Sequence, residues 1–209
     1  MAPKFITIEG IEGVGKSTNI DEIRQCLERA KIDFILTREP GGTPIAEAIR
    51  QILLMDTGEP MVNHTELLLM FAARAQHIAQ VIKPALQMGK WVVCDRFTDA
   101  SYAYQGAGRG IPDAEIAALE QWIQGDLRPD ITFLLDAPVS IALQRAKNRG
   151  GDPDRIEAEE TRFFERVRAG YLARAAQYPE RYHLIQVVQP LEQVQQSIKQ
   201  ILEDMIHAH

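Results

Sequence analysis

Short apolar runs alternate with amphipathic stretches along this chain of 209 residues. Runs rich in Ile, Val, Leu and Phe are typical of strands that are covered on both faces of a sheet. We expect five such strands, over residues 4–9, 34–37, 91–94, 131–135 and 182–188. Apolar residues three or four positions apart predict a first helix that carries Ile20, Ile23 and Leu27. The same periodicity predicts helices over residues 44–54, 63–88, 113–124, 138–149, 157–176 and 191–206.

Capping and turn residues mark some of the boundaries. Thr43 has the side chain of an N-cap, and Pro44 suits the first helical position. Asn63 followed by Glu66 resembles a capping box at the start of the long helix. The glycines over 106–110 predict a loop.

Repeated strand–helix units predict a doubly wound α/β fold with a five-stranded parallel sheet. The expected architecture is a three-layer α/β/α sandwich. No repeat, low-complexity segment or linker divides the sequence, so we expect a single domain over residues 1–209.

The first predicted strand is followed directly by a segment of the form G-x-x-x-x-G-K-S, in a strand–turn–helix setting. With the residue that follows it, the segment comprises Gly10, Ile11, Glu12, Gly13, Val14, Gly15, Lys16, Ser17 and Thr18. Glycines allow backbone amides to converge at a helix N-terminus, where polyphosphates bind. Lys16 adds a cation, and the Ser17 hydroxyl suits Mg²⁺. The segment predicts a P-loop for a nucleoside triphosphate, which we expect to be ATP with Mg²⁺.

Composition narrows the choice of partners and compartment. The formal net charge is −6 and no long basic run occurs, which disfavours a nucleic-acid partner. No apolar stretch has membrane-spanning length, so we expect no membrane partner. Cys26 and Cys94 lack metal-ligand spacing and are expected to be free thiols in a reducing, cytoplasmic compartment.

Charged residues follow the second and third predicted strands: Arg38, Asp95 and Arg96. Ligands of open α/β sheets lie at the carboxyl ends of the strands, so both arginines are expected to face the P-loop and bind anions. Asp95 is a candidate to hold Mg²⁺ together with Ser17. The alternatives are surface ion pairs, including a simple pair between Asp95 and Arg96.

Residues 145–156 carry several cations around a Gly–Pro break, which predicts a closing lid; the alternative is a solvated charged surface. The variable positions of the P-loop hold no cation, whereas phosphoryl transfer needs one. We expect the lid to supply it, from Arg149 as first choice and Arg145 as second. No general base is conspicuous, which suits an acceptor that is already an ionised phosphate. A nucleoside monophosphate kinase fits best.

Two pairs of residues are candidates for the acceptor site. Phe71 and Arg74 share a helix face, and Ser101 and Gln105 lie four positions apart. An aromatic ring beside a guanidinium suits a nucleobase. For Phe71 the alternative is a place in the hydrophobic core.

Several motifs together resemble the thymidylate kinase family. In the order of the family they are the P-loop with its preceding Ile-Glu, Thr-Arg-Glu-Pro-Gly-Gly-Thr at 37–43, Phe-Ala-Ala-Arg at 71–74, Asp-Arg-Phe at 95–97, Ala-Tyr-Gln-Gly at 103–106, Arg-Pro-Asp at 128–130 and Asp-Arg-Ile-Glu at 154–157. The resemblance implies a P-loop fold of the nucleoside monophosphate kinase type. It implies the reaction of Mg·ATP with dTMP to give ADP and dTDP. A P-loop without a cation beside a basic lid resembles the bacterial type of the family.

The resemblance also assigns roles to residues. Arg38 and Arg96 hold the acceptor phosphate, and Lys16 acts with Arg96 in catalysis. Phe71 stacks on thymine, and Arg74 donates a hydrogen bond to its carbonyl group.

The remaining roles concern the base pocket, the sugar and the assembly. Ser101 and Gln105 complete the base pocket. Glu12 receives the 3′-hydroxyl, and Tyr102 screens the 2′ position. The family is usually a homodimer, and the apolar face of the helix over 66–82 is a candidate interface. The alternatives are another nucleotide or deoxynucleoside kinase, and a P-loop regulatory ATPase.

Overall fold

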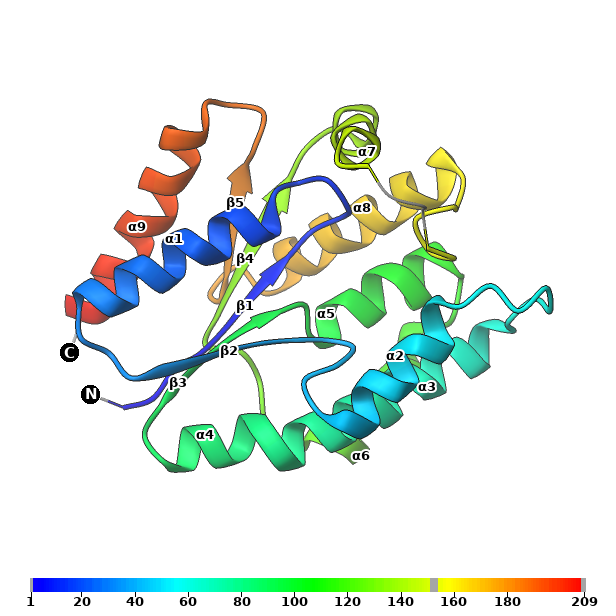
Figure 1. Ribbon diagram of the computed structural model, residues 1–209, viewed down its shortest axis with the longest axis horizontal. Helices are drawn as coiled ribbons and strands as arrows, with labels where there is room; N and C mark the ends of the chain where they lie inside the picture. Colours follow the sequence, from blue (N-terminus) through cyan, green and yellow to red (C-terminus); the bar gives the residue numbers. More distant parts are fainter. Residues whose placement is uncertain (1, 151–153, 208–209) are drawn as a thin grey trace.

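The computed structural model describes residues 2–150 and 154–207. Its centre is a five-stranded sheet in the order β2-β3-β1-β4-β5, and every neighbouring pair is parallel (Figure 1). The strands are β1 (Phe5–Glu9), β2 (Phe34–Arg38), β3 (Trp91–Asp95), β4 (Ile131–Asp136) and β5 (Tyr182–Gln186). The predicted parallel sheet and its five strands are confirmed.

Helices cover both faces of this sheet. They are α1 (Lys16–Arg29), α2 (Pro44–Leu54), α3 (Asn63–His77), α4 (Lys83–Gln87), α5 (Thr98–Ser101), α6 (Asp113–Gln124), α7 (Val139–Asn148), α8 (Thr161–Gln177) and α9 (Leu191–His207). Two wide π-helical segments, η1 (Ile78–Ile82) and η2 (Tyr102–Gly108), continue α3 and α5. Helices α1 and α9 pack together over one face, and α4 and α8 pack on the other (Figure 1). The three-layer expectation is therefore confirmed.

The central strand carries the site. All five residues of β1 are buried, as a continuous apolar run predicts, whereas the edge strands β2 and β5 are partly exposed. The chain leaves β1 for β2 on one side of the sheet, and β4 lies on its other side. Such a switch in strand order opens a crevice at the carboxyl edge, and the P-loop lies there.

One predicted cap is confirmed and the other is wrong. The Thr43 hydroxyl accepts a hydrogen bond from the third residue of α2, as an N-cap does. Helix α3 instead follows Val62 without a side-chain cap, so Asn63 and Glu66 form no capping box. Glu66 is buried and accepts a hydrogen bond from Gln105 Nε2 at 2.8 Å. The Glu66 carboxylate therefore belongs to a buried polar network and is not available to form a capping box.

The predicted loop over 106–110 is also wrong in its first half. The π-helical segment η2 runs on to Gly108, and it packs closely against α8. A Cβ at Gly108 would lie 2.7 Å from the Phe163 ring, and one at Gly170 would lie 2.7 Å from the side chain of Ala107. The glycines allow two helical segments to approach each other, so they do not mark a turn.

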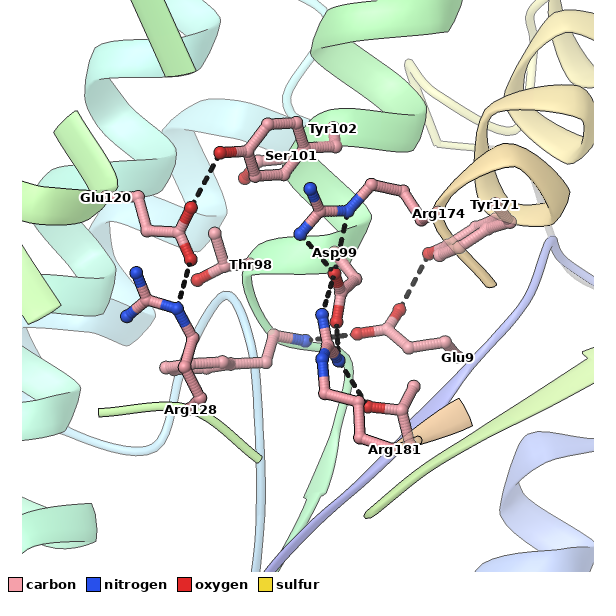
Figure 2. A network of polar contacts seen from close by, with 12 residues as sticks. Glu9, Thr98, Asp99, Ser101, Tyr102, Glu120, Arg128, Tyr171, Arg174 and Arg181 are labelled. Carbon is pink, nitrogen blue, oxygen red and sulfur yellow. Dashed lines mark hydrogen bonds and ion pairs between the residues drawn. The ribbon is translucent and has the colours of Figure 1, made fainter. Parts of the chain in front are cut away.

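A buried ion cluster joins α5, which precedes η2, to α8 and to the turn before β5 (Figure 2). Asp99 is 2% exposed and accepts hydrogen bonds from Arg174 at 2.8 Å and from Arg181 at 2.7 Å. The two arginines, although burial opposes ionisation, hold the pKa of Asp99 below its usual value. The cluster fixes the helices that carry the site against the sheet.

Asp99→Ala is expected to lower the free energy of unfolding by about 3–5 kcal/mol, because it leaves two buried guanidinium groups without their anion. Urea denaturation measures the change. Glu203→Ala is the control, since its exposed pair with Lys199 spans 3.8 Å and is worth less than about 1 kcal/mol. Equal, small losses for both variants would contradict the assignment.

Candidate active site

The P-loop turns sharply between β1 and α1. Gly10, Gly13 and Gly15 have φ angles of 135°, 78° and 89°, in a region that residues with a Cβ rarely adopt. A Cβ on Gly13 would also collide with the carbonyl of Ala142 in α7. The loop thus delivers the unpaired N–H groups at the start of α1 to one point, as a polyphosphate site requires.

Lys16 lies folded over this loop. Its Nζ donates to the carbonyl oxygens of Gly10 at 3.2 Å and Ile11 at 3.1 Å. Burial, and next the charge of Arg96, lowers the pKa of Lys16 to about 8, while nearby carboxylates including Asp95 act in the opposite direction. The ammonium group is therefore held at the phosphate-binding point.

Asp95 meets a simple test for Mg²⁺. Its Oδ1 is buried and has no hydrogen-bond partner among the described residues. Ser17 is exposed at the start of α1. Within residues 2–150 and 154–207, no group of three or more His, Cys, Asp or Glu side chains is able to hold a metal ion. Mg²⁺ commonly relies on one or two protein oxygens together with phosphates and water, and Asp95 and Ser17 fit that pattern.

Arg96 lies between the P-loop and the neighbouring cleft. Its φ of 69° is left-handed. Its Nη1 donates to Gly10 O at 2.8 Å, its Nη2 donates to Glu12 Oε1 at 2.7 Å, and the guanidinium lies 4.9 Å from the centre of the Tyr104 ring. Burial acts to raise the pKa of Glu12, but chiefly Arg96 holds it below its usual value.

Glu9 ends β1 immediately before the loop and is fully buried. Its Oε1 accepts from Phe97 N at 2.7 Å, and its Oε2 accepts from the Tyr171 hydroxyl at 2.7 Å (Figure 2). Burial, and next the charge of Asp99, raises the pKa of Glu9 to about 8. A carboxyl group with such a pKa holds its proton over much of the neutral range.

A cleft opens beside Arg96. Five of the residues predicted for the acceptor site line it: Glu12, Arg74, Arg96, Ser101 and Gln105. They come from the P-loop, α3, the turn after β3, α5 and η2. The structure thus brings together side chains that the sequence separates widely.

Arg74 is 2% exposed and fixed on three sides. Its Nε donates to Glu39 Oε2 at 2.7 Å, its Nη1 to Ser101 Oγ at 3.1 Å and its Nη2 to Phe97 O at 3.2 Å. His77 Nδ1 lies 2.9 Å from the other oxygen of Glu39. A guanidinium has five N–H donors and no acceptor, so Arg74 still offers N–H groups to a ligand in the cleft.

Phe71 and Arg38, like Tyr102, do not line the cleft. Phe71 is 2% exposed in a hydrophobic cluster, and the Arg74 guanidinium lies 4.6 Å from its ring centre. The structure therefore places Phe71 in the hydrophobic core, which was the alternative for this residue. Arg38 is half-exposed and pairs with Glu47 at 2.8 Å.

Tyr102 does not line the cleft. Its hydroxyl donates to Glu120 Oε2 at 2.6 Å, and the residue lines a separate hollow beside α8. Tyr104 lines the cleft instead, and its hydroxyl donates to Glu12 Oε2 at 2.7 Å. Residues two positions apart on a helical segment face different ways.

Arg149 and Arg145, the two candidates for the cation of the predicted lid, have different surroundings. Arg149 pairs with Glu157 at 2.8 Å and lines a second hollow that reaches Glu12 of the P-loop. Arg145 donates from Nη1 to Val187 O at 3.0 Å, which ties α7 to the segment after β5. Of these two arginines, Arg149 is thus the one that borders a hollow reaching the P-loop.

The end of the predicted lid closes onto the cleft. Asp154 and Ile156 are among the residues that line it. Arg155 anchors this segment, since its Nη2 donates to Glu66 Oε2 at 2.7 Å and its Nε donates to the carbonyl of Leu53. Residues 151–153 of the predicted lid lie outside the described residues.

Glu39, Arg50 and Tyr104 also line the cleft and were given no role in the sequence analysis. Tyr104 lies one residue before Gln105, but the four-residue spacing that paired Ser101 with Gln105 did not include it. Glu39 was noted only as part of a motif. No signal separated Arg50, whose Nη1 donates to Pro40 O at 3.1 Å, from the surface arginines.

A P-loop at the central strand, joined through one arginine to a neighbouring cleft, is typical of the class of P-loop nucleoside monophosphate kinases. Comparisons with known proteins narrow this class. The family model described as thymidylate kinase matches residues 8–198, so the chain belongs to the thymidylate kinase family.

Relatives that align over almost their whole length are also thymidylate kinases. The chain is 56% identical over 206 residues to a thymidylate kinase of Pseudomonas fluorescens, covering 99% of this chain and 98% of that one. It is 54% identical to a thymidylate kinase of Alkalilimnicola ehrlichii, covering 97% and 94%. The crystal structure of thymidylate kinase from Ehrlichia chaffeensis superposes with a TM-score of 0.77 at 32% identity, covering 97% of this chain and 100% of that one.

The titration of Glu9 predicts a pH dependence of stability. Its pKa is about 8 in the folded protein, against an ordinary value of 4.5, so the folded form binds the extra proton between these values. The stabilisation that Glu9 contributes to the folded protein is fully present below pH 4.5, and it is lost as the pH rises through about 8. We expect the stability of Glu9→Gln, measured by urea denaturation against the unchanged protein, to improve steadily from about pH 5 to about pH 8. Parallel pH curves for the two proteins would contradict the shift.

Proposed function

We propose that the P-loop and the adjoining cleft transfer the γ-phosphoryl group of ATP to dTMP, giving ADP and dTDP. The position of Arg96 carries this proposal. One guanidinium touches Gly10 and Glu12 of the P-loop and also lines the cleft, so donor and acceptor sites share a cation. Membership of the thymidylate kinase family names the acceptor.

The donor phosphates lie on the backbone N–H groups of the P-loop, from residues 10 to 18, with the Lys16 ammonium beside them. Ser17 and Asp95 are the residues that hold Mg²⁺, which when bound neutralises charge on the β- and γ-phosphates. Residues 145–150 and 154–156 belong to the proposed lid over this end of a single domain. Arg149 supplies its cation, because it borders the hollow that reaches the P-loop.

On the acceptor side, Arg96 and Arg50 hold the phosphate of dTMP. Glu12 accepts the 3′-hydroxyl, and the Tyr104 ring covers the sugar where Tyr102 had been expected. Both arginines and Glu12 line the cleft, which supports this orientation. Arg38 reaches the phosphate only by exchanging its present partner, Glu47.

The base lies against Arg74, with Ser101 and Gln105 beside it. Because a guanidinium donates and never accepts, it suits the carbonyl group of thymine and leaves the amino group of cytosine without an acceptor. Phe71 supports Arg74 from behind, and it stacks on the base only if Arg74 shifts.

The chemistry needs no general base. An ionised oxygen of the dTMP phosphate attacks the γ-phosphorus, a new P–O bond forms, and the bond to the β–γ bridging oxygen breaks. The charge that collects on the transferred group and on the leaving ADP is stabilised by Lys16, Arg96 and Arg149. ADP leaves with the electron pair of the broken bond.

We also propose that two copies of the chain form a homodimer. Over 66–82, five apolar residues are buried in the chain's own core, and Leu68 is a large apolar side chain that stays 57% exposed. Ile45 on α2 and Trp122 on α6, exposed at 56% and 79%, lie on the helices that pack against α3. Exposed apolar side chains on neighbouring helices are typical of a protein interface.

The proposed compartment is the cytoplasm. Cys26 and Cys94 are free and buried, in keeping with a reducing environment. In the part of the chain that the structure describes, every helix is too short or too polar to cross a bilayer.

A substrate panel tests the proposed activity. In a coupled assay for ADP release, we expect turnover to require an acceptor and to be fastest with dTMP, because Arg74 meets a carbonyl only on thymine-like bases. dCMP is expected to be slower by about 100-fold or more, since its amino group leaves a buried donor unpaired. Faster turnover of dCMP, UMP or thymidine, or ADP release without acceptor, would overturn the assignment.

Arginine substitutions in the lid test its role. Arg149→Ala is expected to lower kcat by roughly 10³-fold, as loss of an arginine finger does. Arg145→Ala is the matched comparison and is expected to change kcat less, because that side chain is bound to Val187 O. If Arg149→Ala costs less than about tenfold and Arg145→Ala costs more, the catalytic role belongs to Arg145.

A further inference from the structure

Arg96 has a backbone conformation that its residue type disfavours. Its φ of 69° places it in the left-handed region, where a side chain is strained. The turn nevertheless directs the guanidinium back over the P-loop to Gly10 and Glu12. Such a conformation persists only where the surroundings hold it in place.

Glu9 accepts hydrogen bonds from two groups that flank this strained residue, one beside its backbone and one beside its guanidinium. On the backbone side, its Oε1 accepts from Phe97 N, the next amide along the turn, at 2.7 Å. On the side-chain side, its Oε2 accepts from the Tyr171 hydroxyl at 2.7 Å, and that hydroxyl lies 3.0 Å from Arg96 Nη1. One carboxyl group therefore determines both the path of the chain and the direction of the guanidinium.

This carboxyl group is costly where it lies. Glu9 is 0% exposed, and its two hydrogen-bond donors are a backbone amide and a phenol. No arginine or lysine among the described residues forms an ion pair with it within 4.0 Å. Burial of a carboxyl group without a paired cation is unfavourable for folding, and a neutral side chain would fill the space at lower cost.

We propose that Glu9 is a positioning residue for phosphoryl transfer, acting on Arg96 through Phe97 N and through the Tyr171 hydroxyl. The inference rests on the proposed function, in which Arg96 binds the acceptor phosphate. It adds that the transfer depends on a residue that touches neither nucleotide. Tyr171 lies on α8, which begins shortly after the lid, so the helix beyond the lid also takes part in holding Arg96.

Two conservative variants test this inference. The variants are compared at about pH 9, above the pKa of Glu9 of about 8, where its carboxylate is mostly ionised. There Glu9→Gln keeps the shape but replaces the acceptor that faces Tyr171 with a donor, and Tyr171→Phe removes the hydroxyl alone. Each is expected to lower kcat/KM for dTMP by roughly 10- to 100-fold, as a displaced catalytic group does, with the KM for ATP unchanged within about twofold. The thermal midpoint of Glu9→Gln is expected to be no lower than that of the unchanged protein near pH 8, which separates positioning from loss of fold.

The chain offers a matched control. Glu120 is also a buried glutamate that accepts a tyrosine hydroxyl, that of Tyr102 at 2.6 Å, and both pairs are visible in Figure 2. Glu120→Gln is expected to leave kcat/KM for dTMP within about twofold, because its partner does not reach Arg96. If Glu120→Gln costs as much as Glu9→Gln, the effect is a general one of buried carboxylates and the inference fails.

A double-mutant cycle decides whether Glu9 acts through Arg96. In the background of Arg96→Ala, Glu9→Gln is expected to cause no further loss of kcat/KM. Independent, multiplicative losses would overturn the inference, and so would full activity of both Glu9→Gln and Tyr171→Phe. If Glu9→Gln does not fold, Tyr171→Phe with and without Arg96→Ala decides alone. Failure of the proposed function looks different, because the unchanged protein would then not phosphorylate dTMP.

Discussion

The arrangement of this site depends on one guanidinium held between two nucleotide-binding regions. Arg96 follows β3, next to the central strand β1, and its side chain turns back over the loop that leaves β1. The parallel pairing of these strands sets this approach, because both carboxyl ends reach the same edge of the sheet. From there the Arg96 charge borders the P-loop on one side and the acceptor cleft on the other.

Like charges crowd this junction, and their cost explains several features of the interior. Burial together with Arg96 lowers the pKa of Lys16, and Glu12 stays ionised because it lies beside Arg96. Glu9 keeps a raised pKa without a paired cation. Lys16 and Glu9 thus lie in environments that disfavour their charged forms, and binding of anionic phosphates relieves the repulsion between Lys16 and Arg96. The buried cluster of Asp99 with two arginines stabilises the helices around this strained region.

The sequence predicted the elements that local signals define. Apolar runs located the five strands, and the glycine-rich motif located the phosphate site, because its chemistry is contained in a short segment. Arg74, Ser101 and Gln105 followed from helical spacing, and they meet in the cleft. Nothing in the sequence separated Tyr104, which lines the cleft, from Tyr102, which does not. Glu66 was mistaken for a cap because its partners, Arg109 and Arg155, are far away along the chain. Residues such as Arg50 and Glu9 acquire a role only when tertiary packing brings their neighbours together.

The most direct test of the shared cation is a crystal structure of the protein with dTMP and a non-hydrolysable ATP analogue. We expect the dTMP phosphate to lie within hydrogen-bond distance of the Arg96 guanidinium, with its base against Arg74 and the triphosphate on the P-loop. A complex in which dTMP binds outside this cleft, or in which no guanidinium contacts its phosphate, would contradict the shared role of Arg96.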